Sequence, residues 1–222
     1  MKKQSSRLKK IYKKLYDHFG PQGWWPGETP FEVAIGAILT QNTNWSNVAR
    51  AIRNLKDARC LTSNHLRDIN KTRLSELIRP SGYFNIKAER LKAFLALLHK
   101  EYKGNMKGMG KENPLVLRER LLGVKGIGPE TADSILLYAF NYPVFVVDAY
   151  TRRVLIRHRI LSEKSNYEEI QDFFHKNLPH DAGLFNEYHA LIVRVGKEYC
   201  KRRAKCDGCP LYESSLRLEG FN

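Results

Sequence analysis

Residues 121–133 carry the pattern that decides the fold, and they read Leu121-Leu122-Gly123-Val124-Lys125-Gly126-Ile127-Gly128-Pro129-Glu130-Thr131-Ala132-Asp133. The apolar residues on either side of the glycines predict two helices joined by a tight hairpin. Glycine permits a close backbone approach to a ligand, and proline suits the first position of the second helix. The free N–H groups of such a turn favour an anion such as phosphate. Because any helical hairpin can use a Gly-x-Gly turn, this pattern alone does not assign a function.

A second motif follows, Val146-Val147-Asp148-Ala149-Tyr150, in which a single carboxylate leaves an apolar run. A rigid, buried segment before Asp148 would aim that carboxylate in a fixed direction. The pattern has two interpretations, which can hold together. Asp148 can be an acid that takes part in chemistry, or it can be the N-cap of a helix that begins at Ala149.

The charge of the chain points to a polyanionic partner. Its 222 residues include 38 Lys and Arg against 23 Asp and Glu, which gives a net charge of +15. Nucleic acid is the leading partner for such an excess, and a basic protein without a polyanion ligand is the alternative. No stretch approaches the ~18 apolar residues of a membrane span, and no signal-type apolar segment follows the basic start. The spacing of the four cysteines does not resemble a secreted disulfide framework, so we expect a cytoplasmic protein.

Helical periodicity dominates the chain and predicts an all-α fold. Helices are expected around Leu8 and Leu91, and over residues 31–39, 46–55, 73–78, 116–122, 129–140, 149–158, 167–177 and 183–199. The run 144–147 is the one β-like segment, and it has no obvious partner strand. The glycine-rich segment 103–113 is expected to be a mobile loop.

With these motifs in place, the chain resembles the helix-hairpin-helix (HhH-GPD) superfamily of base-excision DNA glycosylases, in particular the endonuclease III-like group. The hairpin glutamate Glu130 and the acid Asp148 lie eighteen residues apart, which is the spacing of that family. Residues 38–43, residues 79–88 and the C-terminal cysteines add to the resemblance, which covers roughly residues 8–210. Trp24-Trp25-Pro26 and Gln41-Asn42-Thr43 look most like the 3-methyladenine DNA glycosylase branch.

The resemblance implies a two-lobed fold with a DNA-binding groove between the lobes. A six-helix lobe would span residues 21–139 and end in the hairpin, and residues 1–20 and 140–222 would form a terminal lobe. The implied function is base excision repair, in which a flipped, damaged base is cut from double-stranded DNA. The protein is expected to act as a monomer, and to be nucleoid-associated if its source is a prokaryote.

The resemblance gives the two acidic residues different roles. Asp148 would stabilise the positive charge that develops on the sugar and orient a water. Glu130 stands where bifunctional relatives carry a lysine that forms a Schiff base with the sugar. A glutamate cannot form that adduct, so we expect hydrolysis without AP-lyase cleavage. Glu130 would contribute to the base pocket, or else only complement the helix dipole.

Other residues would hold the DNA and the base. The resemblance implies that backbone groups of the hairpin hold phosphate and that Gln41 fills the gap left by the flipped nucleotide. A cationic alkylated purine would stack on aromatic faces. The alternative for each tryptophan is ordinary core packing. The expected base pocket is Trp24, Trp25, Pro26 and Trp45, and the other expected DNA contacts are Lys125, Gly126, Ile127, Gly128, Lys201 and Arg202.

The C-terminal cysteines resemble the iron–sulfur loop of the family but depart from it twice. The spacing of Cys200, Cys206 and Cys209 leaves the first gap one residue short, and Ser215 stands in place of the fourth cysteine. Four cysteine ligands are the rule for a [4Fe–4S] cluster. A cluster with a non-cysteine fourth ligand, a zinc site and a loop without metal all remain open.

The expected substrate is an alkylated purine such as 3-methyladenine. The same scaffold could instead remove uracil or mismatched thymine, or an oxidised pyrimidine, because pocket shape decides among them. A non-catalytic module that binds damaged DNA is the alternative from another class, and the presence of Asp148 argues against it.

Overall fold

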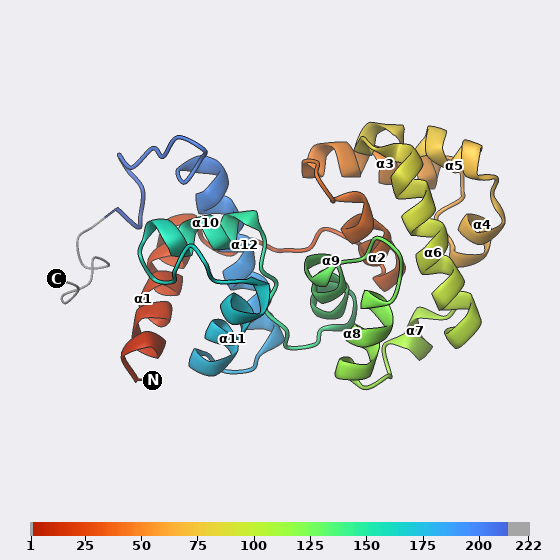
Figure 1. The fold of residues 1–222 in the computed structure, drawn as a ribbon. Coiled ribbons are helices and arrows are strands. Elements are labelled where there is room, and N and C mark those ends of the chain that lie inside the picture. Colours follow the sequence, from red (N-terminus) through yellow and green to blue (C-terminus); the bar gives the residue numbers. More distant parts are fainter. Residues whose placement is uncertain (1, 213–222) are drawn as a thin grey trace. The chain divides into compact units, whose positions relative to one another are not determined.

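The computed structural model describes residues 2–212, and within them every regular element is helical. The expected all-α fold is therefore confirmed (Figure 1). The longer helices are α1 Lys2–Phe19, α2 Pro30–Leu39, α3 Trp45–Asp57, α6 Phe84–Tyr102, α8 Pro114–Leu122, α10 Ala149–Arg157, α11 Tyr167–Asn177 and α12 Ala182–Glu198. The shorter ones are α4 Ser63–Asp68, α5 Lys71–Leu77, η1 Arg79–Ser81, α7 Met106–Met109, α9 Pro129–Ser134 and the π-helical turn η2 Ile135–Ala139. No helix in this part of the chain is long and apolar enough to cross a membrane.

The described part of the chain forms two compact units. The central unit is residues 25–142, and the terminal unit is residues 2–24 with 143–212. These boundaries lie four and three residues beyond those expected, at 21 and 139.

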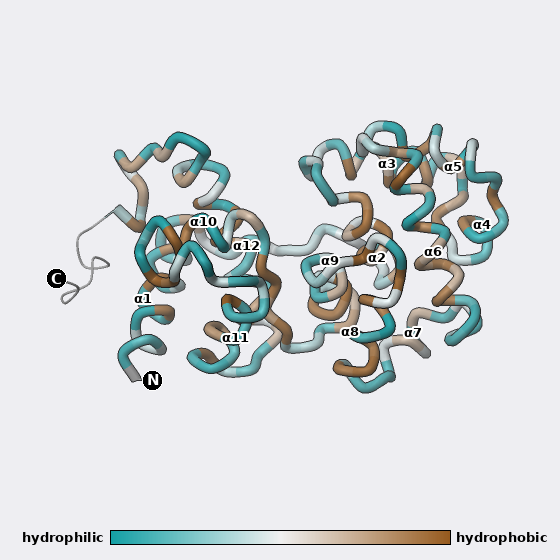
Figure 2. The backbone as a smooth tube through the Cα atoms, viewed as in Figure 1, coloured by the Kyte–Doolittle hydropathy of each residue, from teal (hydrophilic) through white to brown (hydrophobic). Residues whose placement is uncertain are grey.

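The central unit is built around α2, the most apolar helix of the unit (Figure 2). Nine of its ten residues are buried, so the helix is surrounded by protein and has no solvent-exposed face. Thr29 caps its start by accepting a hydrogen bond from the Glu32 N–H at 3.1 Å. Helices α3, α6, α9 and η2 pack around it.

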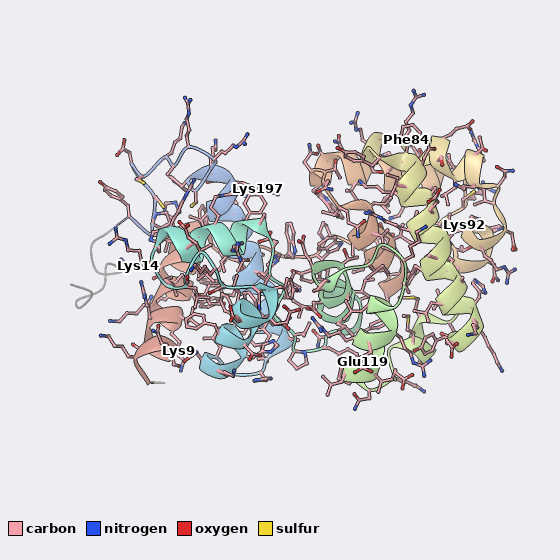
Figure 3. All side chains as sticks on the ribbon, in the orientation of Figure 1. Lys9, Lys14, Phe84, Lys92, Glu119 and Lys197 are labelled. Atoms are coloured by element: carbon pink, nitrogen blue, oxygen red, sulfur yellow. The ribbon has the colours of Figure 1, made fainter. Side chains whose placement is uncertain are left out.

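Two lysines of α6 donate hydrogen bonds to backbone carbonyls at the ends of other helices in the central unit. Lys92, labelled in Figure 3, donates to carbonyls at the end of α4, among them Leu66 O at 3.0 Å. Lys87 is 1% exposed and donates to Leu39 O at 2.8 Å and Ser81 O at 2.6 Å. It therefore fixes the chain just before Gln41.

The terminal unit joins the two ends of the chain. Leu8, Ile11 and Leu15 of α1 are buried, and α1 packs on α11 and α12. The Tyr188 hydroxyl of α12 donates to Leu8 O at 2.9 Å. The N-terminal helix thus packs against the C-terminal part of the chain, as the family resemblance implies.

The prediction of a mobile loop over 103–113 is wrong, because that segment contains α7. Asn105 caps α7, and Met109 is fully buried. The Tyr142 hydroxyl donates to the carbonyls of Gly110 and Glu112 at 2.9 and 2.8 Å. These contacts outweigh the glycine content, which was the signal for a loop. Helix α4 was also not predicted, since six residues are too few to show a period.

Candidate active site

Asp148 is held at the start of α10 with each carboxylate oxygen facing a different partner. Oδ1 accepts the Thr151 N–H at 2.7 Å, so Asp148 is the N-cap of the helix. Oδ2 lies 3.6 Å from Nε2 of His189 on α12. This separation is too long for a hydrogen bond but close enough for electrostatic pairing with a protonated ring. The Asp148 side chain as a whole remains 13% exposed.

The extended run before Asp148 has no partner strand within the described residues, and side chains of α11 take that place. The Phe145 N–H donates to His175 Nε2 at 2.9 Å, and Gln171 Nε2 donates to Phe145 O at 2.7 Å. Closer to the acid, the Val147 N–H donates to the Tyr167 hydroxyl at 3.4 Å. Residues 167, 171 and 175 recur every four positions, so they lie on one face of α11. This row fixes the segment that aims Asp148.

Opposing effects set the pKa of Asp148, which lies below its ordinary value. Burial alone raises the pKa because it penalises the charged form. The His189 imidazole and the hydrogen bond from Thr151 together lower it by more. Asp148 is therefore a carboxylate at neutral pH, the form that can stabilise a developing positive charge.

The hairpin between α8 and α9 has the turn that its sequence predicts. The Ile127 N–H donates to Val124 O at 3.0 Å, and Ile127 is 5% exposed, so its side chain anchors the turn in the core. Gly126 has a φ of +87°, which only glycine adopts readily. Gly128 has an extended backbone, and a Cβ added there would meet open space. No hydrogen bond within residues 2–212 uses the N–H of Gly126 or Gly128, so both can serve a ligand.

A buried ion pair fixes the angle between the two hairpin helices. Asp133 on α9 is fully buried, and Arg118 on α8 donates to both of its carboxylate oxygens, at 2.7 and 3.1 Å. Such a bidentate pair is directional as well as strong. The position of the turn is therefore set by the helices that flank it.

Glu130 is exposed in the first turn of α9, in the central unit, whereas Asp148 belongs to the terminal unit. Lys125 is exposed at the turn itself, before Gly126.

Gln41 lies against the hairpin. Its Nε2 donates to Gly126 O at 3.0 Å and to Thr131 Oγ1 at 2.9 Å, and its Oε1 accepts from Arg90 of α6. Sequence reasoning assigned Gln41 to the duplex gap and did not foresee these contacts, because the three partners come from distant parts of the chain.

Two of the predicted pocket tryptophans meet in the central unit. Trp25 contacts Trp45 edge-to-face, with ring centroids 5.0 Å apart, and stacks on Tyr138 at 4.9 Å. Both tryptophans pack over Gly36 of α2, where an added Cβ would lie 3.5–3.7 Å from their rings. Tyr138 lies on the π-helical turn η2. Such turns often occur at functional sites.

Trp24 belongs to the terminal unit, where the ammonium of Lys197 lies 5.8 Å from its ring centroid (both units are drawn in Figure 3, with Lys197 labelled). The boundary between the units thus falls between the adjacent tryptophans. Pro26 is exposed at a turn that the Gly27 N–H closes on Trp25 O at 2.9 Å.

The C-terminal cysteines do not form a metal site within the described residues. Cys200 is buried, Cys209 is half-buried and Cys206 is exposed, and no group of three His, Cys, Asp or Glu side chains up to residue 212 is placed to hold a metal ion. Burial above all raises the pKa of the Cys209 thiol. Ser215, the candidate for the fourth position, lies outside the described residues. The three cysteines alone therefore do not supply the four ligands that are the rule for the [4Fe–4S] cluster implied by the sequence resemblance.

Two arginines of α10 form hydrogen bonds to the loop that carries Cys200, Cys206 and Cys209, here called the cysteine loop. Arg153 donates to Cys200 O at 2.6 Å, and Arg157 donates to Cys200 Sγ at 3.4 Å and to Arg202 O at 2.8 Å. The side chains of Lys201 and Arg202 are exposed on the loop.

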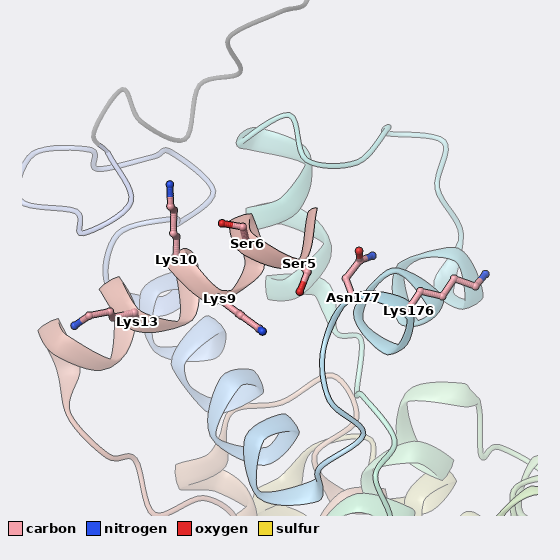
Figure 4. A pocket seen from close by; sticks show the side chains of 7 residues that line it. All are labelled: Ser5, Ser6, Lys9, Lys10, Lys13, Lys176 and Asn177. Atoms are coloured by element: carbon pink, nitrogen blue, oxygen red, sulfur yellow. The ribbon is translucent and has the colours of Figure 1, made fainter. Parts of the chain in front are cut away.

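A basic hollow of about 620 Å³ lies in the terminal unit and contains none of the predicted site residues (Figure 4). Two of its lysines are already paired with carboxylates, Lys13 with Asp17 and Lys176 with Asp172, each at 2.6 Å. Its lining residues are Ser5, Ser6, Lys9, Lys10, Lys13, Lys176 and Asn177, from α1 and the end of α11.

Sequence reasoning missed three residues that lie at these sites, His189, Arg90 and Tyr138, and a fourth residue, Tyr83, that stands out by its exposure and backbone. His189 and Arg90 carried no signal, because each acts on a residue far away in the chain. Tyr138 looked like one more apolar residue of a helix. Tyr83 could have been noticed, since it follows a glycine: it is 67% exposed and has a strained φ of +46°.

Comparison with known families gives one match over most of the chain. The profile of the family described as "HhH-GPD superfamily base excision DNA repair protein" matches residues 35–180. A candidate DNA repair glycosylase of Methanocaldococcus jannaschii is 50% identical over 209 residues, which cover 93% of this chain and 94% of the relative.

Solved structures agree with this match. The 3-methyladenine DNA glycosylase MagIII of H. pylori, bound to 1,N6-ethenoadenine, is 31% identical with a TM-score of 0.76, over 88% of this chain and 97% of that one. An endonuclease III, trapped as a covalent intermediate with DNA, has a TM-score of 0.80 at 21% identity, over 93% of each chain, and shows the shared fold.

Proposed function

The chain belongs to the HhH-GPD superfamily of base excision DNA repair proteins, and we propose that it is a monofunctional DNA glycosylase that removes alkylated purines. The coarser assignment, a base excision repair DNA glycosylase, follows from the family and from the relative that is 50% identical. The geometry of Asp148 is the observation that carries the chemical part of the proposal.

The position of Asp148 suits cleavage of an N-glycosidic bond. The bond breaks as positive charge develops on the sugar, and a fixed anion stabilises that charge without having to reorganise. Contacts from Thr151 and His189 hold the carboxylate, and its pKa lies below the ordinary value. A water oriented by Asp148 would complete hydrolysis.

Glu130 supports hydrolysis without strand cleavage. A lyase step through a Schiff base requires an amine nucleophile, and the family position for that lysine is Glu130 in this chain. The endonuclease III structure contains a covalent DNA intermediate. We expect no such adduct here, and we expect Glu130 to favour a cationic base by charge attraction.

The aromatic cluster supports the choice of substrate. Trp25, Trp45 and Tyr138 form a surface of ring faces and edges in the central unit. Electron-poor, positively charged purines gain both stacking and cation–π attraction from such rings. The similar MagIII is a 3-methyladenine glycosylase bound to an ethenoadenine. Pro26 follows Trp25 directly and would border this pocket, and Trp24 is proposed as a further aromatic residue that stacks on the base.

DNA would be held by the hairpin and by the cysteine loop. The N–H groups of Gly126 and Gly128 would bind phosphate, with Ile127 as the buried anchor and Lys125 beside the turn. Lys201 and Arg202 would contact the backbone elsewhere. Gln41 would enter the duplex gap, and Tyr83 is an exposed ring that could separate neighbouring bases.

The test is release of free base from duplexes that contain 3-methyladenine, 1,N6-ethenoadenine, uracil, mismatched thymine or an oxidised pyrimidine. We expect release of an alkylated purine with no strand scission. Asp148→Asn is a matched control, because asparagine is an equally good N-cap and keeps an oxygen for the Thr151 N–H. It should fold with an unchanged Tm and release no base.

Two results would contradict the proposal. Trapping of the wild-type protein on DNA by borohydride would exclude a monofunctional enzyme. Preferred release of a neutral pyrimidine would exclude the assigned substrate. Trp25→Leu tests the pocket separately, because it should reduce release of cationic purines more than release of any neutral base.

A further inference from the structure

Arg90 covers the hairpin on the side of Gly126. A Cβ added to Gly126 would lie 2.5–2.8 Å from Cγ, Nε and Cδ of Arg90, so the arginine stem packs directly on this glycine. Arg90 is half-buried and reaches the turn from α6. Its guanidinium therefore lies beside the backbone that we assign to DNA phosphate.

The guanidinium of Arg90 has no carboxylate partner among the described residues. It donates instead to a neutral amide oxygen, Oε1 of Gln41. A guanidinium has five N–H donors, so most of them are left for a ligand. Burial lowers the pKa of Lys87, and the charge of Arg90 nearby lowers it further. The neighbouring carboxylate Glu89 is paired with Lys71 at 2.7 Å. An anionic ligand would relieve this excess of positive charge.

The same contact restrains Gln41. One hydrogen bond from Arg90 and two donated by Gln41, to Gly126 O and Thr131 Oγ1, hold the side chain on the hairpin. Gln41 must break these bonds before it can enter a duplex.

We propose that Arg90, which reaches the hairpin from α6, binds the DNA phosphate there, and that phosphate binding releases Gln41. When Arg90 exchanges the Gln41 amide oxygen for a phosphate oxygen, a stronger charge-assisted bond replaces a neutral one. Gln41 then loses the one charged partner that it has among the described residues, and only the two neutral bonds to Gly126 and Thr131 still have to break before it inserts. Arg90 is thus a positioning residue that couples phosphate contact to insertion. The inference rests on the proposed function, because it requires that the hairpin bind DNA.

The experiment measures Kd by fluorescence anisotropy over a series of salt concentrations, for an intact duplex and for one with a tetrahydrofuran abasic site. Arg90→Met should reduce the slope of log Kd against log salt by about one, because one phosphate contact is lost. It should weaken binding of the intact duplex about tenfold. The abasic duplex should lose less affinity, since the released Gln41 compensates there.

Matched variants separate phosphate binding from the restraint on Gln41. Arg90→Lys should restore the salt slope. Gln41→Ala should leave the slope unchanged and weaken only the abasic duplex. Thr131→Val, which removes one bond to Gln41, should tighten binding of the abasic duplex. The melting temperature of each variant checks that it is folded.

The decisive comparison is Arg90→Met in the Gln41→Ala background. The slope should again fall by about one. An unchanged slope would overturn the inference, because it would mean that Arg90 acts only through Gln41. Base release by the wild-type protein tests the proposed function independently, so an active enzyme with an unchanged slope would contradict Arg90 alone. A wild-type protein that shows the Arg90 effect but releases no base would contradict the glycosylase.

Discussion

At the scale of single residues, Asp148 is the N-cap of α10, and we propose that it is also the catalytic acid. As an N-cap it is fixed by the Thr151 N–H, and this contact leaves its second oxygen facing His189. Capping and a catalytic role are therefore compatible, because a carboxylate has two oxygens. His189 is only 4% exposed, so its ring has little freedom to leave this position.

Replacing His189 should change turnover more than binding. His189→Leu removes a group that lowers the pKa of Asp148, so that pKa should rise and a larger fraction of the acid should be neutral at low pH. We expect kcat to fall by about 10- to 100-fold with little change in KM, and the acid limb of the pH profile to move to higher pH. Single-turnover base release, measured from below pH 4 up to about pH 9 so that the acid limb of the wild-type protein is included, shows both effects.

His189→Asn is the control for that prediction, because it keeps a hydrogen-bond donor near Asp148. It should recover part of kcat. If both variants lost activity equally and kept the wild-type pH profile, His189 would be a packing residue only.

Lys87 should make stability depend on pH in the alkaline range. Burial lowers its pKa from 10.5 to about 8. Between those values the unfolded chain binds a proton that the folded chain does not, so the contribution of Lys87 to stability rises with pH. From pH 8 to 9.5 the gain is about 2 kcal/mol.

Lys87→Met tests this dependence by urea denaturation at pH 7 and pH 9.5. The variant leaves Leu39 O and Ser81 O without their donor, which costs about 1–3 kcal/mol for each group. Its deficit relative to the wild-type protein should be larger at pH 9.5, because only the wild type gains stability there. A deficit that is equal at both pH values would contradict the assigned pKa.

At the scale of elements, the two glycines of the hairpin are needed for different reasons, Gly126 for the fold and Gly128 for DNA binding. Gly126→Ala combines a positive φ with a clash against Arg90, so it should destabilise the fold by about 2 kcal/mol. Gly128→Ala meets neither problem, because its backbone is extended and the space around it is open.

Gly128→Ala should therefore keep the wild-type Tm and yet weaken DNA binding about tenfold, since the new methyl group would occupy the space expected for phosphate. Thermal melting and anisotropy on the same sample measure both quantities. Unchanged DNA affinity in Gly128→Ala would show that phosphate does not approach the turn here.

The second feature at this scale is the row of side chains on α11, Tyr167, Gln171 and His175, that binds the segment before Asp148. Gln171 is buried and satisfies Phe145 O, so Gln171→Met should destabilise the protein by about 1–3 kcal/mol. Because the segment also aims Asp148, kcat should fall in the folded variant. Asn177→Ala, elsewhere on α11, is the control and should leave kcat unchanged. Loss of stability without any loss of kcat would separate this row from the site.

At the scale of the whole molecule, the charge of +15 should make DNA affinity depend steeply on salt. We expect the paired change Lys201→Gln with Arg202→Gln to lower the salt slope by about two, because both side chains are exposed on the cysteine loop. Lys13→Gln with Lys176→Gln removes the same net charge, but both of these lysines already pair with carboxylates. That control should leave the slope unchanged. Equal slopes for the two double variants would mean that net charge, and not the loop, sets the affinity.

The sequence by itself determined the helical class, the hairpin and the acid. Local signals were enough for these features, because glycine, proline and apolar periodicity act over one or two turns of chain. Most helix bounds followed from the same signals, and the failures at α4 and α7 involve elements of six and four residues.

Only the tertiary structure decided which side chains meet. His189 lies forty-one residues from Asp148 in sequence, and Arg90 contacts both Gln41 and Gly126. The unpaired run 144–147 looked like a strand because it is buried and β-branched, but its hydrogen bonds go to side chains of α11. Composition cannot indicate such pairings, since they depend on how helices pack and not on local propensity. For the same reason the sequence located the acid, and the fold determined what holds it in place.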